Sequence, residues 1–86
     1  MIIVSQDKNS VVNYDNVEII GIDRNNKKQI ACGFAEGSMS LGEYATEERA
    51  KEVLQEIVSK YKTTLYNPKT NETVVNVPKV YEMPTK

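Results

Sequence analysis

The sequence contains no histidine and no tryptophan, and Cys32 is its single cysteine. Without histidine, the chain cannot form a Cys–His or Ser–His nucleophile pair, nor a metal site that uses imidazole. A single cysteine cannot close a disulfide within the chain, which is typical of a reducing compartment. The apolar neighbours of Cys32 favour a strand or core position over a reactive thiol.

Long apolar runs are also missing. No window approaches the roughly 20 apolar residues of a membrane span. The amino-terminal sequence MIIVSQDK lacks the basic region and the apolar run of a signal peptide. We therefore expect a soluble protein of the cytoplasm that has no membrane partner.

Neither sign of charge dominates, because 11 basic residues face 12 acidic ones and the net charge is −1. Proteins that bind duplex DNA need a clustered positive surface. The nearest cluster is Arg24, Lys27 and Lys28, which is typical of the solvated tip of a hairpin. The composition therefore predicts no specific nucleic-acid partner, and Arg24 is kept only as a candidate contact for a small ligand.

The chain has 86 residues, which is enough for one small domain, and we treat residues 1–86 as such. A chain of this length buries only about 60% of the surface that its unfolded form exposes. Its core is therefore marginal, and association with further copies is a common remedy.

Short β-prone segments separated by turn residues fill residues 1–45. They centre on IIV, VV, VEIIGID, QIACGFA and SMSLGEY. Because the connections are short, we expect consecutive segments to pair antiparallel. The sequence predicts a meander of about five strands.

Residues 46–62 carry the clearest helical pattern. Thr46 is a good N-cap, and Glu47 and Glu48 place negative charge in the first turn, where the helix dipole favours it. One apolar stripe follows, made of Ala50, Val53, Leu54, Ile57, Val58 and Tyr61. A helix of this length is not stable alone, so the stripe must cover one face of the sheet. The predicted class is α+β.

Residues 63–86 contain Pro68, Pro78 and Pro84 among turn residues and short β-prone runs. Two readings are open for this segment, an edge strand of the sheet or an extended arm that reaches a neighbour. Tyr66, Tyr81 and Met83 lie in it, and tyrosine is common at interfaces. These three residues are the candidate interface residues, and docking within the monomer is the alternative.

The junction between the last β-prone segment and the helix reads SLGEYATEERAKEVLQEI. Tyr44 precedes the N-cap and Arg49 follows the first turn. The free amides of a helix N-terminus suit an anion, a tyrosine ring can stack on a base, and an arginine can hold a phosphate. In the other reading, Tyr44 packs over the start of the helix, and Glu47 and Glu48 repel an anion.

No motif predicts catalysis. Asp7, Asp15 and Asp23 fall in turns, where aspartate commonly caps the backbone, and nothing pairs two buried carboxylates. The glycines are not followed by the lysine and hydroxyl residue of a phosphate loop. We expect a protein that is not an enzyme and that uses no cofactor and no metal.

The order of the motifs resembles small uncharacterised proteins encoded by phages and prophages of Gram-positive bacteria. These share a Ser-Gln-Asp turn, an Asn-Tyr-Asp-Asn segment, Leu-Gly-x-Tyr before a Glu-rich helix, and a late aromatic residue followed by Met-Pro. This chain has them as SQD, NYDN, LGEY and VYEMP. The resemblance implies a protein that acts in the cytoplasm of the host cell and counters host defence.

The resemblance extends to the Thoeris anti-defence proteins, small α+β oligomers that sequester cyclic ADP-ribose-type signals in pockets between protomers. It implies a homo-oligomer that binds such a nucleotide. The candidate contacts for this ligand, chosen from the chemistry of the side chains and not from the resemblance, are Tyr44, Arg49 and Arg24. The alternative is an inhibitor of a host protein, comparable to anti-CRISPR proteins, or a structural accessory. Such a protein acts through an exposed patch that contains tyrosine.

Overall fold

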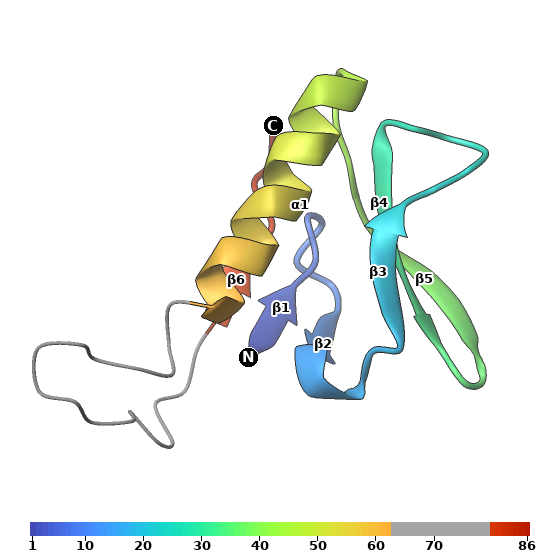
Figure 1. Ribbon diagram of the computed structural model, residues 1–86, viewed down its shortest axis with the longest axis vertical. Coiled ribbons are helices and arrows are strands. Elements are labelled where there is room, and N and C mark those ends of the chain that lie inside the picture. Colours follow the sequence, from blue (N-terminus) through green and yellow to red (C-terminus); the bar gives the residue numbers. More distant parts are fainter. Residues whose placement is uncertain (63–79) are drawn as a thin grey trace, which may run out of the picture.

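The structure is a computed structural model that describes residues 1–62 and 80–86. The strands are β1 (Ile2–Val4), β2 (Val11–Asn13), β3 (Ile19–Ile22), β4 (Gln29–Phe34), β5 (Gly37–Glu43) and β6 (Val80–Glu82). A short 3-10 helix, η1 (Tyr14–Asn16), follows β2, and the α-helix α1 (Glu47–Lys62) follows β5 (Figure 1). Within the described residues, this order of strands together with the long helix α1 confirms the predicted α+β class.

The strands form two three-stranded sheets, with the orders β2-β1-β6 and β3-β4-β5. The second sheet is the antiparallel meander that the short connections predict. The division into two sheets, in place of one meander of five strands, follows from the segment after β2. There the Asn13 side chain accepts a hydrogen bond from the Asp15 amide (3.0 Å) and turns the chain into η1. The next strand therefore starts a new sheet.

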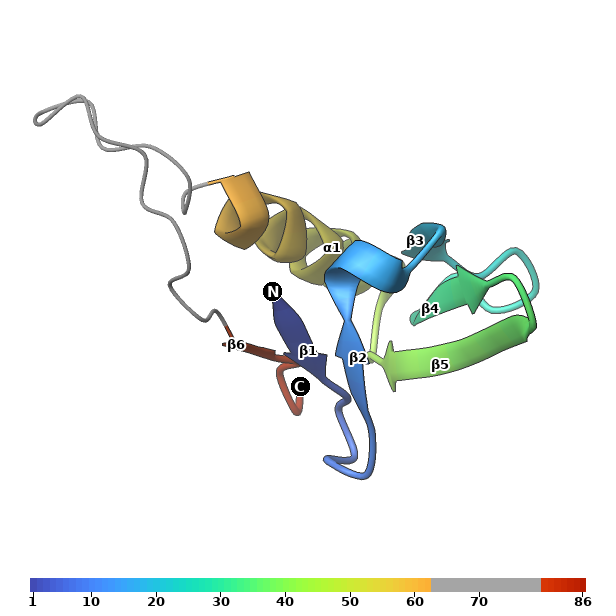
Figure 2. The same cartoon turned by 90° about the horizontal axis from the view of Figure 1, so that it is seen from below.

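The helix begins as its sequence predicts. The hydroxyl of Thr46 accepts a hydrogen bond from the Arg49 amide at 3.1 Å, which satisfies one of the free amides of the first turn. Ala50, Val53 and Ile57 are fully buried, so the apolar stripe faces the strands. Figure 2 shows α1 lying across both sheets. The helix thereby covers the core, as expected.

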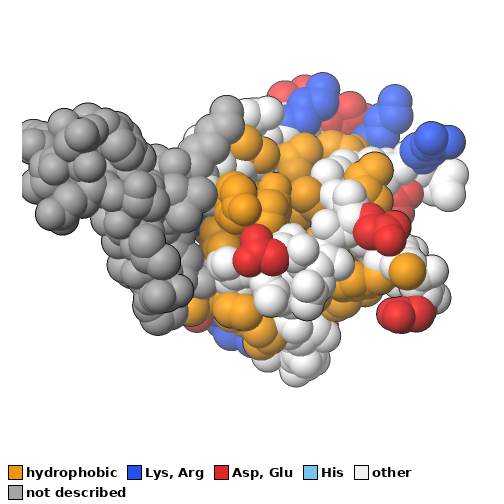
Figure 3. All heavy atoms as spheres, turned by 60° about the horizontal axis from the view of Figure 1, so that its bottom comes forward, with side chains coloured by type: hydrophobic (Ala, Val, Ile, Leu, Met, Phe, Trp, Pro, Cys, Tyr) orange, Lys and Arg blue, Asp and Glu red, His pale blue; other side chains and the backbone are white. Residues whose placement is uncertain are grey.

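The core joins both sheets, the helix and the segment after β6. Its buried residues are Ile3, Val12, Ile30, Cys32, Leu41, Tyr44, Ala50, Val53, Ile57 and Met83. Burial raises the pKa of the Cys32 thiol, in keeping with the predicted core position. Some aliphatic side chains stay outside, among them Val11, Ile19 and Val80. Figure 3 shows hydrophobic side chains gathered in several patches on one face, broken by acidic and polar groups.

β6 is an edge strand that runs parallel to β1, with Tyr81 opposite Ile3. The Met83 amide then donates to the Val4 carbonyl at 3.0 Å, which continues the pairing by one residue. For residues 80–82, the edge-strand reading of the carboxyl-terminal segment is therefore correct. Residues 63–79, with Tyr66, lie outside the described residues.

Candidate binding site

Three motifs singled out in the sequence, SQD, LGEY and MP, meet in space. Gln6 is the centre of this meeting. Its backbone amide donates to the Leu41 carbonyl at 2.8 Å. Its side-chain amide pairs with the backbone of Glu43, donating to the carbonyl and accepting from the amide, both at 2.8 Å. Gln6 thus occupies the outer edge of β5 as a neighbouring strand would.

The segment after β6 is held by side chains from three separate parts of the chain. Gln6 donates to the carbonyls of Pro84 (3.3 Å) and Thr85 (3.2 Å), and the Tyr44 hydroxyl donates to that of Pro84 (2.9 Å). Nε of Arg49 donates to the Lys86 carbonyl at 3.0 Å. We call Gln6, Tyr44, Arg49 and residues 83–86 the tail latch. All of these acceptors are backbone carbonyls, so the latch holds main chain rather than particular side chains.

Tyr44 and Arg49 are therefore brought together, as the sequence predicts, but their contacts are internal. Tyr44 is only 4% exposed, and the Arg49 guanidinium lies 6.0 Å from the centre of its ring. Nη1 of Arg49 also lies 3.2 Å from the Glu52 carboxylate and 3.8 Å from that of Glu56. Of the two readings of this junction, the geometry is that of packing, since the ring is covered and the guanidinium is shared.

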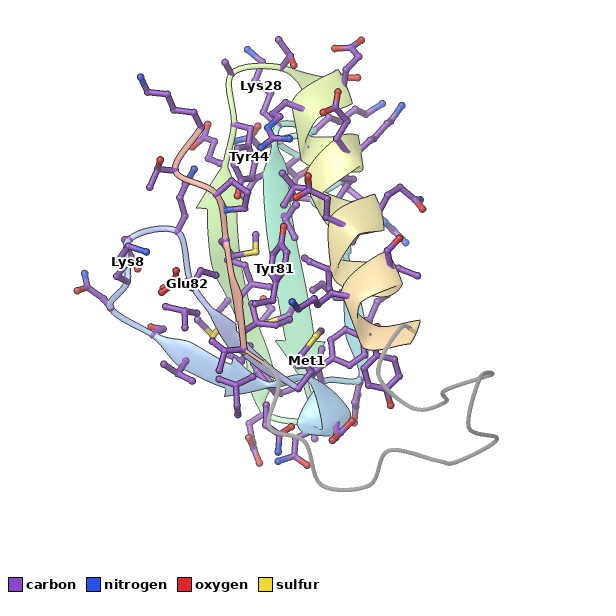
Figure 4. The ribbon with its side chains drawn as sticks, turned by 90° about the vertical axis from the view of Figure 1, so that its left-hand side faces the viewer. Met1, Lys8, Lys28, Tyr44, Tyr81 and Glu82 are labelled. Carbon is purple, nitrogen blue, oxygen red and sulfur yellow. The ribbon has the colours of Figure 1, made fainter. Side chains whose placement is uncertain are left out.

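The remaining candidate residues lie elsewhere. Arg24 is exposed in the turn between β3 and β4, and it makes no hydrogen bond or ion pair with the described residues. Met83 is 1% exposed and belongs to the core, where it presents no surface to a partner. Its docking within the monomer is the alternative that the sequence left open. Tyr81 is half-buried and lies beside α1 (Figure 4).

A groove of about 800 Å³ runs along the outer face of α1 next to Tyr81. We call it the α1–β6 groove. It is lined by Glu48, Lys51, Glu52, Gln55, Glu56, Ser59, Lys60 and Tyr81. Figure 4 shows the Tyr81 side chain between the β6 segment and the helix. The groove is open to solvent, and none of its lining residues belongs to the tail latch.

Tyr81 fixes one side of the groove, because its hydroxyl donates to the Glu56 carboxylate at 2.7 Å. Burial raises the pKa of Tyr81, and the Glu56 carboxylate raises it further. Burial also raises the pKa of Tyr44. A raised tyrosine pKa stabilises the fold below the ordinary value of about 10, and this contribution is lost as the pH rises above it. Both hydroxyls are therefore protonated donors near neutral pH.

The sequence pattern did not predict the role of Gln6 or the groove. The groove had a readable signal, because Glu48, Glu52 and Glu56 recur every four residues and so lie on one side of α1. The signal for Gln6 was weaker: it lies in the Ser-Gln-Asp turn that this chain shares with the phage and prophage proteins it resembles. The hydrogen bonds of its side chain join residues 37 to 79 positions apart, which no local pattern reports.

Within residues 1–62 and 80–86, no group of three histidine, cysteine, aspartate or glutamate side chains is placed to hold a metal ion. No helix in the same residues has the length and apolar character needed to cross a membrane. Comparisons with protein-family models, with curated proteins and with solved structures gave no match to this chain.

The packing of the tail latch can be tested at Gly42. A methyl group there would lie 3.0 Å from Cβ of Gln6 and 3.2 Å from the Tyr44 hydroxyl oxygen. Gly42→Ala is therefore expected to displace both side chains and to lower the free energy of unfolding by about 1–3 kcal/mol. Urea denaturation measures the loss, and amide hydrogen exchange shows whether residues 83–86 open.

The matched control is Gly21, where an added methyl group meets no atom within 4 Å. Gly21→Ala is expected to be neutral or to stabilise by up to about 1 kcal/mol, because alanine restricts the unfolded chain. Equal losses for the two variants would contradict the close packing of Gln6 and Tyr44 over Gly42.

Proposed function

We propose that this chain is a non-enzymatic binding protein that acts on a protein partner through the α1–β6 groove. The observation that carries the proposal is the contrast between the two parts of the site. The groove is open and built on a regular helix, whereas the donors of the tail latch are engaged within the chain. A tyrosine at the groove, apolar in its ring and polar at its hydroxyl, is typical of protein interfaces.

The charges favour a protein partner over a nucleotide. Carboxylates of Glu48, Glu52 and Glu56 line the groove and repel phosphate groups. Arg49, the arginine nearest to them, already contacts two of these carboxylates. Capture of a cyclic ADP-ribose-type nucleotide therefore needs a different pocket, such as one shared between protomers.

The resemblance to phage and prophage proteins supplies the biological setting of the proposal. In that setting the partner is a host protein in the cytoplasm, and binding it counters host defence. In this proposal, the groove at Tyr81 serves as the exposed patch with tyrosine through which such a protein acts.

Capture from a lysate of a Gram-positive bacterium tests the groove with two matched variants. Ser59 lines the groove, whereas Ser38 lies in β5, and both are exposed. The tagged protein is expected to retain a discrete host protein, and Ser59→Arg is expected to weaken this capture at least about tenfold, a loss of 1.4 kcal/mol. Ser38→Arg is expected to leave it unchanged. The proposal is wrong if nothing is retained, or if the two variants behave alike.

Heating the same protein with cyclic ADP-ribose isomers separates the two functions. A ligand at about 100 times its dissociation constant adds about 2.7 kcal/mol. In a domain of this size that raises the melting temperature by roughly 10–20 °C. We expect no shift, and a shift of this size would instead support capture of a nucleotide.

A further inference from the structure

β6 has one edge that no described residue pairs with, because the sheet order is β2-β1-β6. Successive residues of a strand direct their backbone groups to opposite sides. The Met83 amide donates to Val4 of β1, so Tyr81 faces β1 as well, and Val80 and Glu82 face outward. Val80 is 54% exposed at this edge. The outward N–H and C=O groups of Val80 and Glu82 are a template for a further strand.

The α1–β6 groove lies next to this edge. In Figure 4 the β6 segment and α1 run alongside each other, with Tyr81 between them. The hydrogen bond from Tyr81 to Glu56 spans the two elements at 2.7 Å. A chain that pairs with β6 would therefore have the outer face of the helix at its side.

The carboxylates on that face have the spacing of an extended chain. Glu48, Glu52 and Glu56 follow one another every four residues, which is about 6 Å along a helix. Side chains on one side of a strand are about 6.6 Å apart. Basic side chains at alternate positions of a strand thus match this row of carboxylates step for step.

Two of the three carboxylates are available for such pairing. Glu48 forms no ion pair or hydrogen bond with the described residues. The Glu52 side chain is 67% exposed. Its ion pair with Arg49 lies at the surface and contributes little, so a basic side chain of a partner can replace Arg49 in it. Lys51 and Lys60 also line the groove, so the match is to spaced cations rather than to a uniformly basic chain.

We propose that the groove receives an extended segment of the partner protein, which adds to β6 as a fourth strand and carries lysine or arginine at alternate positions. This inference rests on the proposed function and names the mode of binding. The backbone of β6 supplies affinity, and Glu48 and Glu52 select the basic side chains.

The probe is an eight-residue peptide of alternating lysine and valine, added to the full, isotopically labelled protein. Amide hydrogen exchange is expected to slow at least tenfold at Val80 and Glu82. It is expected to stay unchanged at Met83, whose amide is already bonded within the chain. Two control peptides are expected not to bind, one with glutamate in place of lysine and one N-methylated along a single edge.

The double variant Glu48→Gln, Glu52→Gln tests the charge match on the protein side. Each exposed ion pair contributes little, so the affinity is expected to fall about two- to fivefold per carboxylate. The loss should disappear at high salt. A helical circular dichroism spectrum like that of the unchanged protein confirms that α1 is intact.

Each outcome decides between defined alternatives. Binding without slower exchange at Val80 and Glu82, or equal binding of the N-methylated peptide, overturns strand addition. Binding of the glutamate peptide, or none of the lysine peptide, overturns the basic segment. Because groove-dependent capture from the lysate is measured separately, the mode of binding can fail while the proposed function stands.

Discussion

Replacing Met83 with alanine is expected to lower the free energy of unfolding by about 2–5 kcal/mol, as for other fully buried methionines. Met83 is 1% exposed and packs in the core, and its amide holds the end of β6 to Val4. The truncation leaves a cavity and loosens the anchor of β6. The free energy of unfolding of a small domain is only about 5–15 kcal/mol in total. This single change therefore removes a large part of the stability.

Urea denaturation measures the loss, and Thr85→Ala is the matched control. Thr85 is exposed and takes part in the tail latch through its backbone carbonyl, which alanine retains. Thr85→Ala is expected to change the free energy of unfolding by no more than about 0.5 kcal/mol. If Met83→Ala changed self-association but not the stability of the monomer, Met83 would be an interface residue, as the sequence first predicted.

Replacing Ile57 with alanine is expected to cost a similar amount, about 2–5 kcal/mol. Ile57 is fully buried at the centre of the apolar stripe of α1. Its loss weakens the contact of the helix with the strands, which is the main source of stability for a helix of this kind. The effect is expected to appear as a lower denaturation midpoint with an unchanged slope, because the folded state stays compact.

The control for Ile57 is its neighbour on the opposite face, Gln55, which is exposed and lines the groove. Gln55→Ala is expected to change the stability by about 0.5 kcal/mol or less, since alanine is a good helix former. A small loss at Ile57, or equal losses at both positions, would contradict the packing of α1 on the sheets.

These residues also show how far local patterns determine this fold. The cap at Thr46 and the apolar spacing of residues 50–61 define α1, because both signals lie within a few turns of one helix. Strands β3, β4 and β5 each pair with the strand next to them in sequence, so their antiparallel pairing also follows from the short connections.

The parts that escaped prediction depend on distant contacts. β6 pairs in parallel with β1, and Gln6 reaches Pro84 across 78 positions of sequence. Hydrophobic periodicity reports which side of an element is buried, not which remote element it meets. For this reason Tyr44 and Arg49 were recognised as neighbours, whereas the carbonyl groups that they hold were not.

The position of β1 between β2 and β6 has a consequence for the solubility of the protein. β1 carries three consecutive β-branched or aliphatic residues, Ile2, Ile3 and Val4, and β6 covers one of its edges. β6 has only three residues and lies at the edge of its sheet, so it can open locally while the rest of the fold stays intact. Each opening turns an interior strand into a bare aliphatic edge, which is the kind of surface on which amyloid-like stacking begins. The short β6 strand therefore guards the protein against aggregation.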